Sequence, residues 1–170
     1  SSILPNPAEV CEGSDLLLNG NPSGGSGIYT NHLWTGAHVD SLNNPNIQSP
    51  IFQSDNSGAF LIFYAVTDNN GCIGNSSIVI DVFENPVAAI LPDPASVCPG
   101  ASLILNGNPS GGSGVFVNHL WTGVGTSSLD NVNIQSPTFG QPNPGNYNLT
   151  YTVTDDNGCQ GSDNITVEVL

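Results

Sequence analysis

The sequence predicts an all-β fold consisting of two tandem antiparallel β-sandwiches with about seven strands each. The first observation is a repeat: Cys11 falls on Cys98 when the chain is shifted by 87 positions, and about 45 of 80 aligned pairs are identical. The second is that short segments alternate apolar and polar residues, with turn residues between them. No segment has the apolar period of a helix. We therefore assign residues 1–86 to copy one and residues 87–170 to copy two.

The two copies act as controls for each other in deciding which strand face points inward. In residues 58–68 every second position is apolar or aromatic in both copies, whereas the positions between them are apolar in copy one and polar in copy two. Alternation with a period of two predicts a strand, and the face that is apolar in both copies is the core face. The same comparison predicts inward-facing residues at 16–18 and 78–82. The predicted core aromatics are Trp34, Tyr64, Trp121 and Tyr151.

Turn signals separate the predicted strands at short intervals. They include Asn19-Gly20, the Gly/Ser run at 23–27 and Asn70-Gly71. Glycine takes positive φ without strain, and asparagine stabilises turns through local backbone hydrogen bonds. Such frequent turns predict a sandwich of antiparallel sheets.

The four cysteines are divided equally between the copies. An even number without zinc-type CxxC spacing predicts disulfides, and disulfides indicate an oxidising, extracellular compartment. Because each copy has its own pair, we expect the bonds Cys11–Cys72 and Cys98–Cys159. A bond between the copies, Cys11–Cys159, is the alternative, and buried free thiols are a third possibility.

The composition excludes several classes of partner. The chain has no Lys or Arg and 14 Asp plus Glu, which gives a formal charge of −14. Such a surface has nothing to neutralise phosphate, so we expect neither nucleic acid nor anionic membrane surfaces as partners. No apolar run approaches the roughly 18 residues of a membrane span, so we expect no membrane insertion. A secretion signal and any anchor are expected to lie outside these residues.

Several motifs resemble those of a known family. The segments 58–68 and 145–155, GAFLIFYAVTD and GNYNLTYTVTD, resemble the GxYxVxxTVTD strand of PKD and related immunoglobulin-like modules. With Asn-Gly-Cys at 70–72 and Val-Cys-x-Gly at 10–13, the chain is similar to the PKD-like repeats of giant Bacteroidetes cell-surface adhesins, including the gliding-motility type. The resemblance implies two immunoglobulin-like sandwiches and an extracellular, cell-surface location. Trp34-Thr35-Gly36 stands where the family has WDFGDG, so a ligand role of that acidic loop is not carried over.

The sequence offers little support for catalysis. His32 and His119 each lie two residues before a predicted core tryptophan. A metal ligand or general base is one interpretation, and a packing histidine beside the tryptophan is the favoured one. The Ser/Gly run at 23–27 lacks the lysine of a phosphate-binding loop. We therefore expect that the chain is not an enzyme.

Calcium is the only cofactor candidate. Its candidate ligands cluster on the last hairpin of each copy: Asp68, Asn70, Asp155, Asp156 and Asn157. Calcium prefers six to eight oxygen ligands, which such side chains supply. The alternative, which we favour, is that these side chains cap the turn through local hydrogen bonds.

One strand face differs between the copies. Leu61, Phe63 and Ala65 face away from the predicted core, whereas the matching residues of copy two are polar. An apolar outer face indicates a contact. Either residues 39–52 of the same copy fold over it, which we favour, or another chain covers it.

These observations predict a structural spacer repeat of a large secreted cell-surface adhesin or filament that supports adhesion or gliding motility. The joint at 83–92 carries Pro86 and Pro92, which restrict bending. The expected partners are neighbouring repeats, and extracellular glycan or other copies of the filament are further candidates. A module that itself binds glycan or a solid surface is the alternative function, and an accessory domain of a secreted enzyme is a second alternative.

Overall fold

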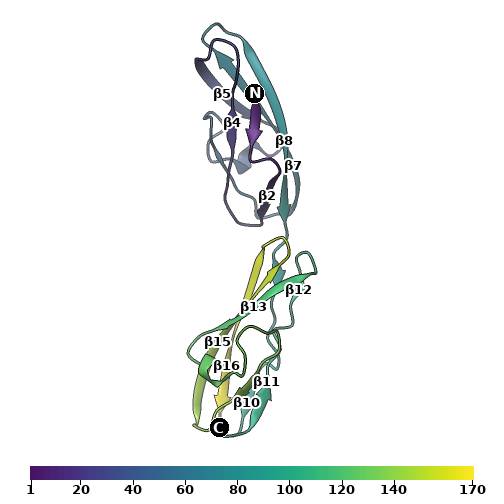
Figure 1. The fold of residues 1–170 in the computed structure, drawn as a ribbon, viewed down its shortest axis with the longest axis vertical. Helices are drawn as coiled ribbons and strands as arrows, with labels where there is room; N and C mark the ends of the chain where they lie inside the picture. Colours follow the sequence, from purple (N-terminus) through teal and green to yellow (C-terminus); the bar gives the residue numbers. More distant parts are fainter. The chain divides into compact units, whose positions relative to one another are not determined.

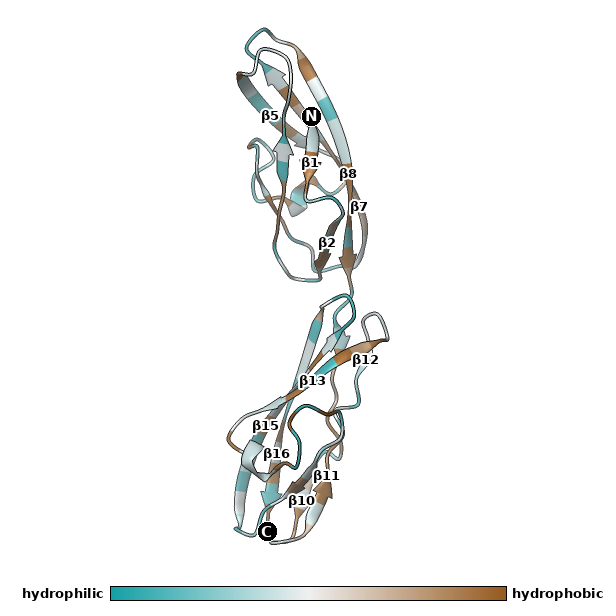
Figure 2. Cartoon of the chain, viewed as in Figure 1, coloured by the Kyte–Doolittle hydropathy of each residue, from teal (hydrophilic) through white to brown (hydrophobic).

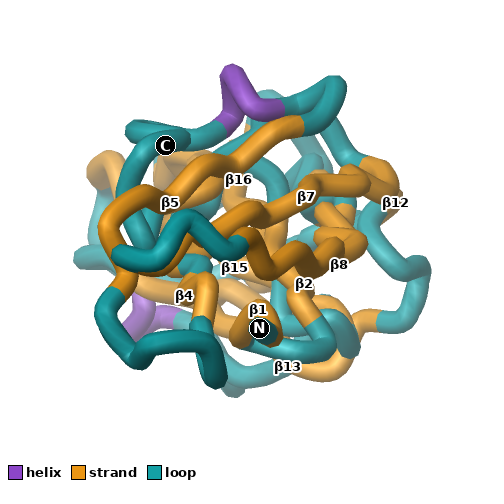
Figure 3. Tube along the Cα trace, turned by 90° about the horizontal axis from the view of Figure 1, so that it is seen from above, coloured by secondary structure: helices purple, strands orange, loops and turns teal.

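The computed structural model describes all residues, Ser1–Leu170, as two compact units (Figure 1). The first unit is Ser1–Phe83 and the second is Glu84–Leu170. Every regular element is a strand except two short 3-10 turns, which stand out in Figure 3. The all-β prediction of two tandem sandwiches is therefore confirmed. Neither turn has the length or apolar character of a membrane-spanning helix.

The first unit contains eight strands in two layers. The elements are β1 (Ser2–Leu4), β2 (Ala8–Cys11), β3 (Leu16–Leu17), β4 (Asn19–Asn21), β5 (Tyr29–Thr35), η1 (Val39–Ser41), β6 (Ile51–Phe52), β7 (Gly58–Asp68) and β8 (Ile73–Phe83). The main sheet has the order β2-β8-β7-β5, and the opposite layer consists of the pairs β1-β4 and β3-β6.

One strand pair differs from the predicted antiparallel arrangement. Strand β2 runs parallel to β8, with Cys11 opposite Phe83. The first strand is divided at Pro5 and Pro7, which have no backbone N–H to donate to a ladder. Strands β1 and β2 therefore lie in opposite layers, and β2 joins the main sheet from its edge.

The second unit repeats this arrangement. Its elements are β9 (Pro86–Val87), β10 (Ala95–Val97), β11 (Ser102–Ile104), β12 (Ser110–Gly111), β13 (Phe116–Thr122), η2 (Thr126–Ser128), β14 (Thr138–Gly140), β15 (Gly145–Asp155) and β16 (Gln160–Val169). The main sheet is β10-β16-β15-β13, and the other layer contains β11-β14 and β12-β9.

The boundary between the units lies between Phe83 and Glu84, three residues before the division after residue 86 that the repeat predicted. Pro86 and Val87 form β9, which pairs with β12 of the second unit. Farther along, Leu91 pairs with Asn106 in an isolated bridge. Most of the predicted joint is therefore hydrogen-bonded within the second unit rather than forming a free linker.

Each core lies between the two layers of its own unit. Figure 2 shows hydrophobic and hydrophilic bands following one another along β8. The inward residues Ile62, Ile80 and Leu18 are completely buried. All four aromatic residues assigned to the cores are also buried: Trp34, Tyr64, Trp121 and Tyr151.

The expected cover over the apolar outer face of copy one is absent. Leu61 and Phe63 are each 46% exposed. The segment at 39–52 packs on the opposite layer instead, because the ring of Phe52 is completely buried and β6 pairs with β3. The prediction that this loop covers the face is therefore wrong.

Candidate functional site

The carboxylate of Asp68, at the end of β7, accepts several backbone hydrogen bonds. Asp68 is only 5% exposed. Its Oδ1 accepts hydrogen bonds from the backbone N–H groups of Asn70 and Cys72, both at 2.9 Å, and its Oδ2 accepts one from Ser26 at 3.0 Å. One carboxylate therefore organises the last hairpin and attaches the loop at 23–27 to it.

Copy two has the same arrangement around Asp155, which is completely buried. Its donors are the backbone N–H groups of Asn157, Cys159 and Ser113, at 3.1, 2.8 and 3.0 Å. The close approach of the loop requires glycine: Gly112 has φ +58°, and a Cβ there would lie 2.7 Å from the carboxylate oxygen. The Gly/Ser run is thus explained by the carboxylate that it contacts.

The hydrogen bonds at these carboxylates fit turn capping, the alternative to calcium binding. The N–H of Ser26, followed by that of Cys72, lowers the pKa of Asp68 below its usual value, since these bonds favour the charged form. Asn70, Asp156 and Asn157 are exposed. The chain contains no group of three His, Cys, Asp or Glu side chains placed to hold a metal. Calcium binding at the five candidate ligands therefore stays a hypothesis.

Each histidine beside a core tryptophan has a tyrosine partner. His32 Nδ1 lies 2.6 Å from the hydroxyl oxygen of Tyr64, and the two rings are stacked with centroids 6.1 Å apart. The Trp34 ring centroid lies 4.7 Å from that of Tyr64, and its Nε1 donates to the Ile47 carbonyl at 2.8 Å. These contacts are those of packing histidines, because the imidazole nitrogen is directed at a core side chain.

The tyrosine partner was not found from the sequence. His32 lies opposite Val66 in the β5–β7 ladder, and Tyr64 is two residues away from Val66 on the same face. Such diagonal neighbours are within reach of aromatic side chains. Finding the pair from the sequence would have required the register between β5 and β7, because His32 and Tyr64 are 32 positions apart in the chain.

A glycine in the opposite layer allows the tyrosine ring to lie flat against the backbone. A methyl group at Gly20 would overlap the Tyr64 ring, and one at Gly107 would overlap the Tyr151 ring. Gly20 lies in β4, where it pairs with Ile3. The prediction of a turn at Asn19-Gly20 is therefore wrong: this glycine provides space for a ring rather than a turn.

The cysteine pairing differs from the prediction. Cys72 and Cys98 are free and exposed, whereas Cys11 and Cys159 are disulfide-bonded. Each predicted pair contains one free thiol, so Cys11–Cys72 and Cys98–Cys159 are wrong. The alternative that the sequence left open, Cys11–Cys159, is compatible with these states of the four cysteines.

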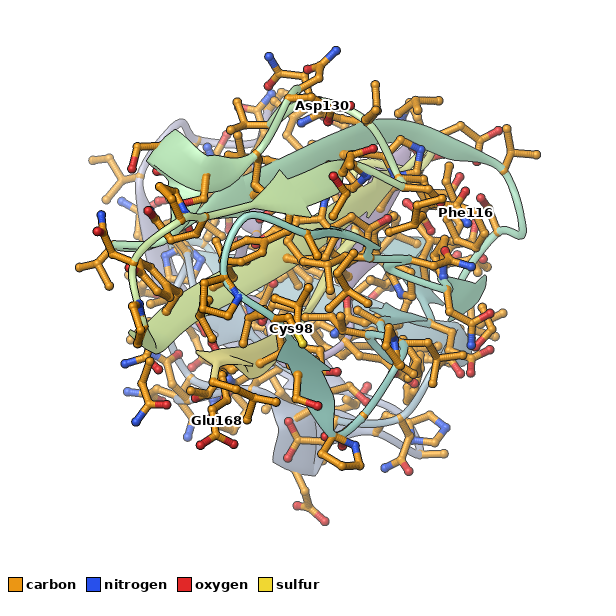
Figure 4. All side chains as sticks on the ribbon, turned by 90° about the horizontal axis from the view of Figure 1, so that it is seen from below. Cys98, Phe116, Asp130 and Glu168 are labelled. Carbon is orange, nitrogen blue, oxygen red and sulfur yellow. The ribbon has the colours of Figure 1, made fainter.

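Strand topology explains why the pairs within a copy do not form. Cys11 lies opposite Phe83 at the end of β8, whereas Cys72 directly precedes the start of β8. Strand β8 has 11 residues, which separates the two cysteines by roughly 33 Å at about 3.3 Å per residue. Disulfides require Cα atoms within about 7 Å. Cys98 likewise lies beside the far end of β16, near Glu168, as labelled in Figure 4.

Comparisons with known proteins agree with this fold. Residues 93–169, all in copy two, match a family model for a PKD domain. No curated protein matches the chain. The matching model thus describes a PKD domain, which is the kind of domain that the strand motif of residues 145–155 resembles.

Among solved structures, the chain is similar to a C-terminal 282-residue fragment of intimin in complex with the intimin-binding domain of its translocated receptor. The identity is 10% and the TM-score 0.52, over 91% of this chain and 57% of that one. The fibronectin(III)-like modules of Clostridium thermocellum CbhA (13% identity, TM-score 0.42, 95% and 88% covered) and Drosophila OTK extracellular domains 3–5 (12%, 0.47, 96% and 60%) also match. The chain thus spans about 60% of the OTK and intimin fragments. Copy two is thus similar to a PKD domain over residues 93–169, and the likeness to the intimin fragment shows an immunoglobulin-like β-sandwich fold.

Proposed function

We propose that the chain is a structural spacer repeat of a large secreted cell-surface adhesin or filament, which supports adhesion or gliding motility. The polar side chains that were candidates for chemistry stabilise the fold instead: Asp68 caps a turn and His32 contacts a core tyrosine. PKD and immunoglobulin-like folds are typically non-catalytic modules. What remains is a well-packed unit that is repeated in tandem.

The observation that carries the proposal is that one cysteine of each copy, Cys11 and Cys159, is disulfide-bonded, whereas Cys72 and Cys98 are free. We infer the bond Cys11–Cys159, the pairing that the sequence left as an alternative. Tension applied to the two ends would then pass along the first 11 residues, through the bond, and along the last 12. Residues 12–158 would carry no tension, which suits a stalk that must keep its length under load.

Single-molecule pulling of the chain, held at both ends, tests this function. The oxidised chain should extend by only about 80 Å, because roughly 23 residues lie outside the bond. The Cys11→Ser variant should extend by about 600 Å, which corresponds to the unfolding of the whole chain. An oxidised wild-type chain that extends as far as the variant would contradict the proposal.

A second candidate is direct binding of glycan or a solid surface. The exposed Leu61 and Phe63 of copy one offer an apolar face for it, while both tryptophans are buried. A glycan array probed with the wild-type chain and with Phe63→Thr, in calcium and in EDTA, tests this candidate. Binding that is lost in the variant would favour it.

A further inference from the structure

The dipeptide Asn-Gly occurs twice in each copy. Asn19-Gly20 and Asn106-Gly107 face the core tyrosines, whereas Asn70-Gly71 and Asn157-Gly158 lie at the tips of the last hairpins. Asparagine is chemically labile, and a following glycine has no side chain to shield its backbone nitrogen from reaction with the asparagine amide. The four sites have the same local chemistry, so any difference in their reactivity comes from the fold.

The inner site of copy one is closed. A methyl group on Gly20 would overlap the Tyr64 ring, so the ring lies directly against this part of the backbone. The N–H of Gly20 donates to the Gln48 carbonyl at 2.9 Å, and the side-chain oxygen of Asn19 accepts from Gln48 Nε2 at 3.2 Å. Both groups that would have to react are therefore held apart, with no room for the side chain to turn toward the nitrogen.

The inner site of copy two is closed in the same way. A methyl group on Gly107 would overlap the Tyr151 ring. The N–H of Gly107 donates to the Gln135 carbonyl at 3.0 Å, and Asn106 Oδ1 accepts from Gln135 Nε2 at 3.0 Å. Reaction at either inner site thus requires the layer to separate from the core.

The outer sites are open. Asn70 and Asn157 are exposed, and no hydrogen bond holds either side-chain amide. A methyl group on Gly71 or Gly158 would meet nothing within 4 Å. The N–H of each glycine donates only within its own turn, to the carbonyl of the capping aspartate at 3.0 Å. Local opening of the hairpin tip is therefore enough to bring the reacting atoms together, and the core stays intact.

We propose that Asn70 and Asn157 are sites of spontaneous deamidation in the folded chain, and that the fold protects Asn19 and Asn106 from the same reaction. The modification is separate from the proposed spacer function and does not rest on it.

The reaction needs only water. A solvent base removes the proton of the glycine N–H, and the nitrogen attacks the Cγ atom of the asparagine. The new N–C bond closes a cyclic imide, and the side-chain amide group leaves as ammonia after it takes a proton from solvent. Water then opens the ring. Cleavage at Cγ yields aspartate, whereas cleavage at the former main-chain carbonyl yields isoaspartate, in which the main chain passes through Cβ and Cγ.

Isoaspartate would disturb the carboxylate cap of the hairpin. Oδ1 of Asp68 accepts from the N–H groups of Asn70 and Cys72, which lie on either side of the modified linkage. An added main-chain atom between these donors changes their separation, so Oδ1 cannot hold both in good geometry. The same carboxylate holds the N–H of Ser26. The isoaspartate form should therefore loosen the hairpin and the loop at 23–27 together.

Ageing of the folded chain in mildly alkaline buffer tests the difference between the sites. Chymotrypsin is the suitable protease, because the chain has no Lys or Arg for trypsin, and mass spectrometry then measures each site separately. Asn70 and Asn157 should convert at least about tenfold faster than Asn19 and Asn106, since only the outer sites react after local opening. In urea all four should convert at similar rates. Equal rates in the folded chain, or outer sites that convert only in urea, would overturn the inference.

The double variant Asn70→Ser/Asn157→Ser tests the effect on the cap, because serine cannot form the imide. Enzymatic methylation of isoaspartate measures the modified fraction during the same ageing. The melting temperature of the wild-type chain should decrease as this fraction rises, while that of the variant stays constant. A wild-type chain that accumulates isoaspartate at both tips without a change in melting temperature would overturn the role of the cap. An equal decrease in the variant would overturn it as well.

Discussion

The Nδ1 atom of His119 lies 2.6 Å from the hydroxyl oxygen of Tyr151, and the two rings stack with their centroids 6.0 Å apart. Burial lowers the pKa of His119 and raises the pKa of Tyr151 to about 12. Both groups are therefore held neutral at physiological pH. The pair has the same hydrogen-bond length as His32 and Tyr64 in copy one.

The lowered pKa of His119 predicts a loss of stability in mild acid. Below about pH 6.5 the unfolded chain binds a proton at this histidine that the folded chain resists. The free energy of unfolding should therefore decrease as pH falls from about 6.5 toward the folded pKa. Urea unfolding between pH 5 and pH 8 measures it. His119→Asn should remove this part of the pH dependence, and an unchanged dependence in the variant would contradict the assignment.

Gly107→Ala should destabilise copy two. The added methyl group would overlap the Tyr151 ring, which is completely buried and has no free space to move into. Overpacking of this kind costs about 1–3 kcal/mol. Gly140→Ala is the matched control, because its methyl group would approach only Ser102, at 4.0 Å. Thermal unfolding compares them, and equal melting temperatures would show that the ring does not need the glycine.

Asp155→Asn should lower the stability of copy two by about 1–3 kcal/mol, since an amide cannot accept all the backbone hydrogen bonds that the buried carboxylate accepts. Asp156→Asn is the control: it is exposed, and copy one has Asn69 at the same position. Unfolding in calcium and in EDTA adds a test of the calcium hypothesis. If turn capping is the whole role of Asp155, the two conditions should give the same curve for each protein.

Phe63→Thr should leave the stability of copy one nearly unchanged, because the side chain is 46% exposed and copy two has threonine at the matching position. Sedimentation of the wild-type and variant chains then shows whether the face mediates self-association. A clear drop in melting temperature would mean that a segment of the chain covers Phe63 in solution. Val79→Thr, which copies the residue of copy two on the neighbouring strand, is a second variant of the same face.

The sequence predicted what depends on local pattern. The inward faces of β7 and β15 followed from alternation, because the side-chain period of a strand requires no knowledge of its neighbours. The cysteine pairing did not follow, because it depends on β2 running parallel to β8 and so placing Cys11 beside Phe83. The bond between Asp68 and Ser26 was missed for a similar reason, since 42 positions separate them.

The constant period of the repeat affects how a gene for such modules can change in length. The capping aspartate, the tyrosine and the glycine that makes room for its ring recur with the same 87-residue period. Unequal recombination between two matching points of neighbouring copies removes or adds whole periods. A recombined copy therefore still contains one residue of each kind, and the number of repeats can vary between descendants without leaving a copy that cannot pack.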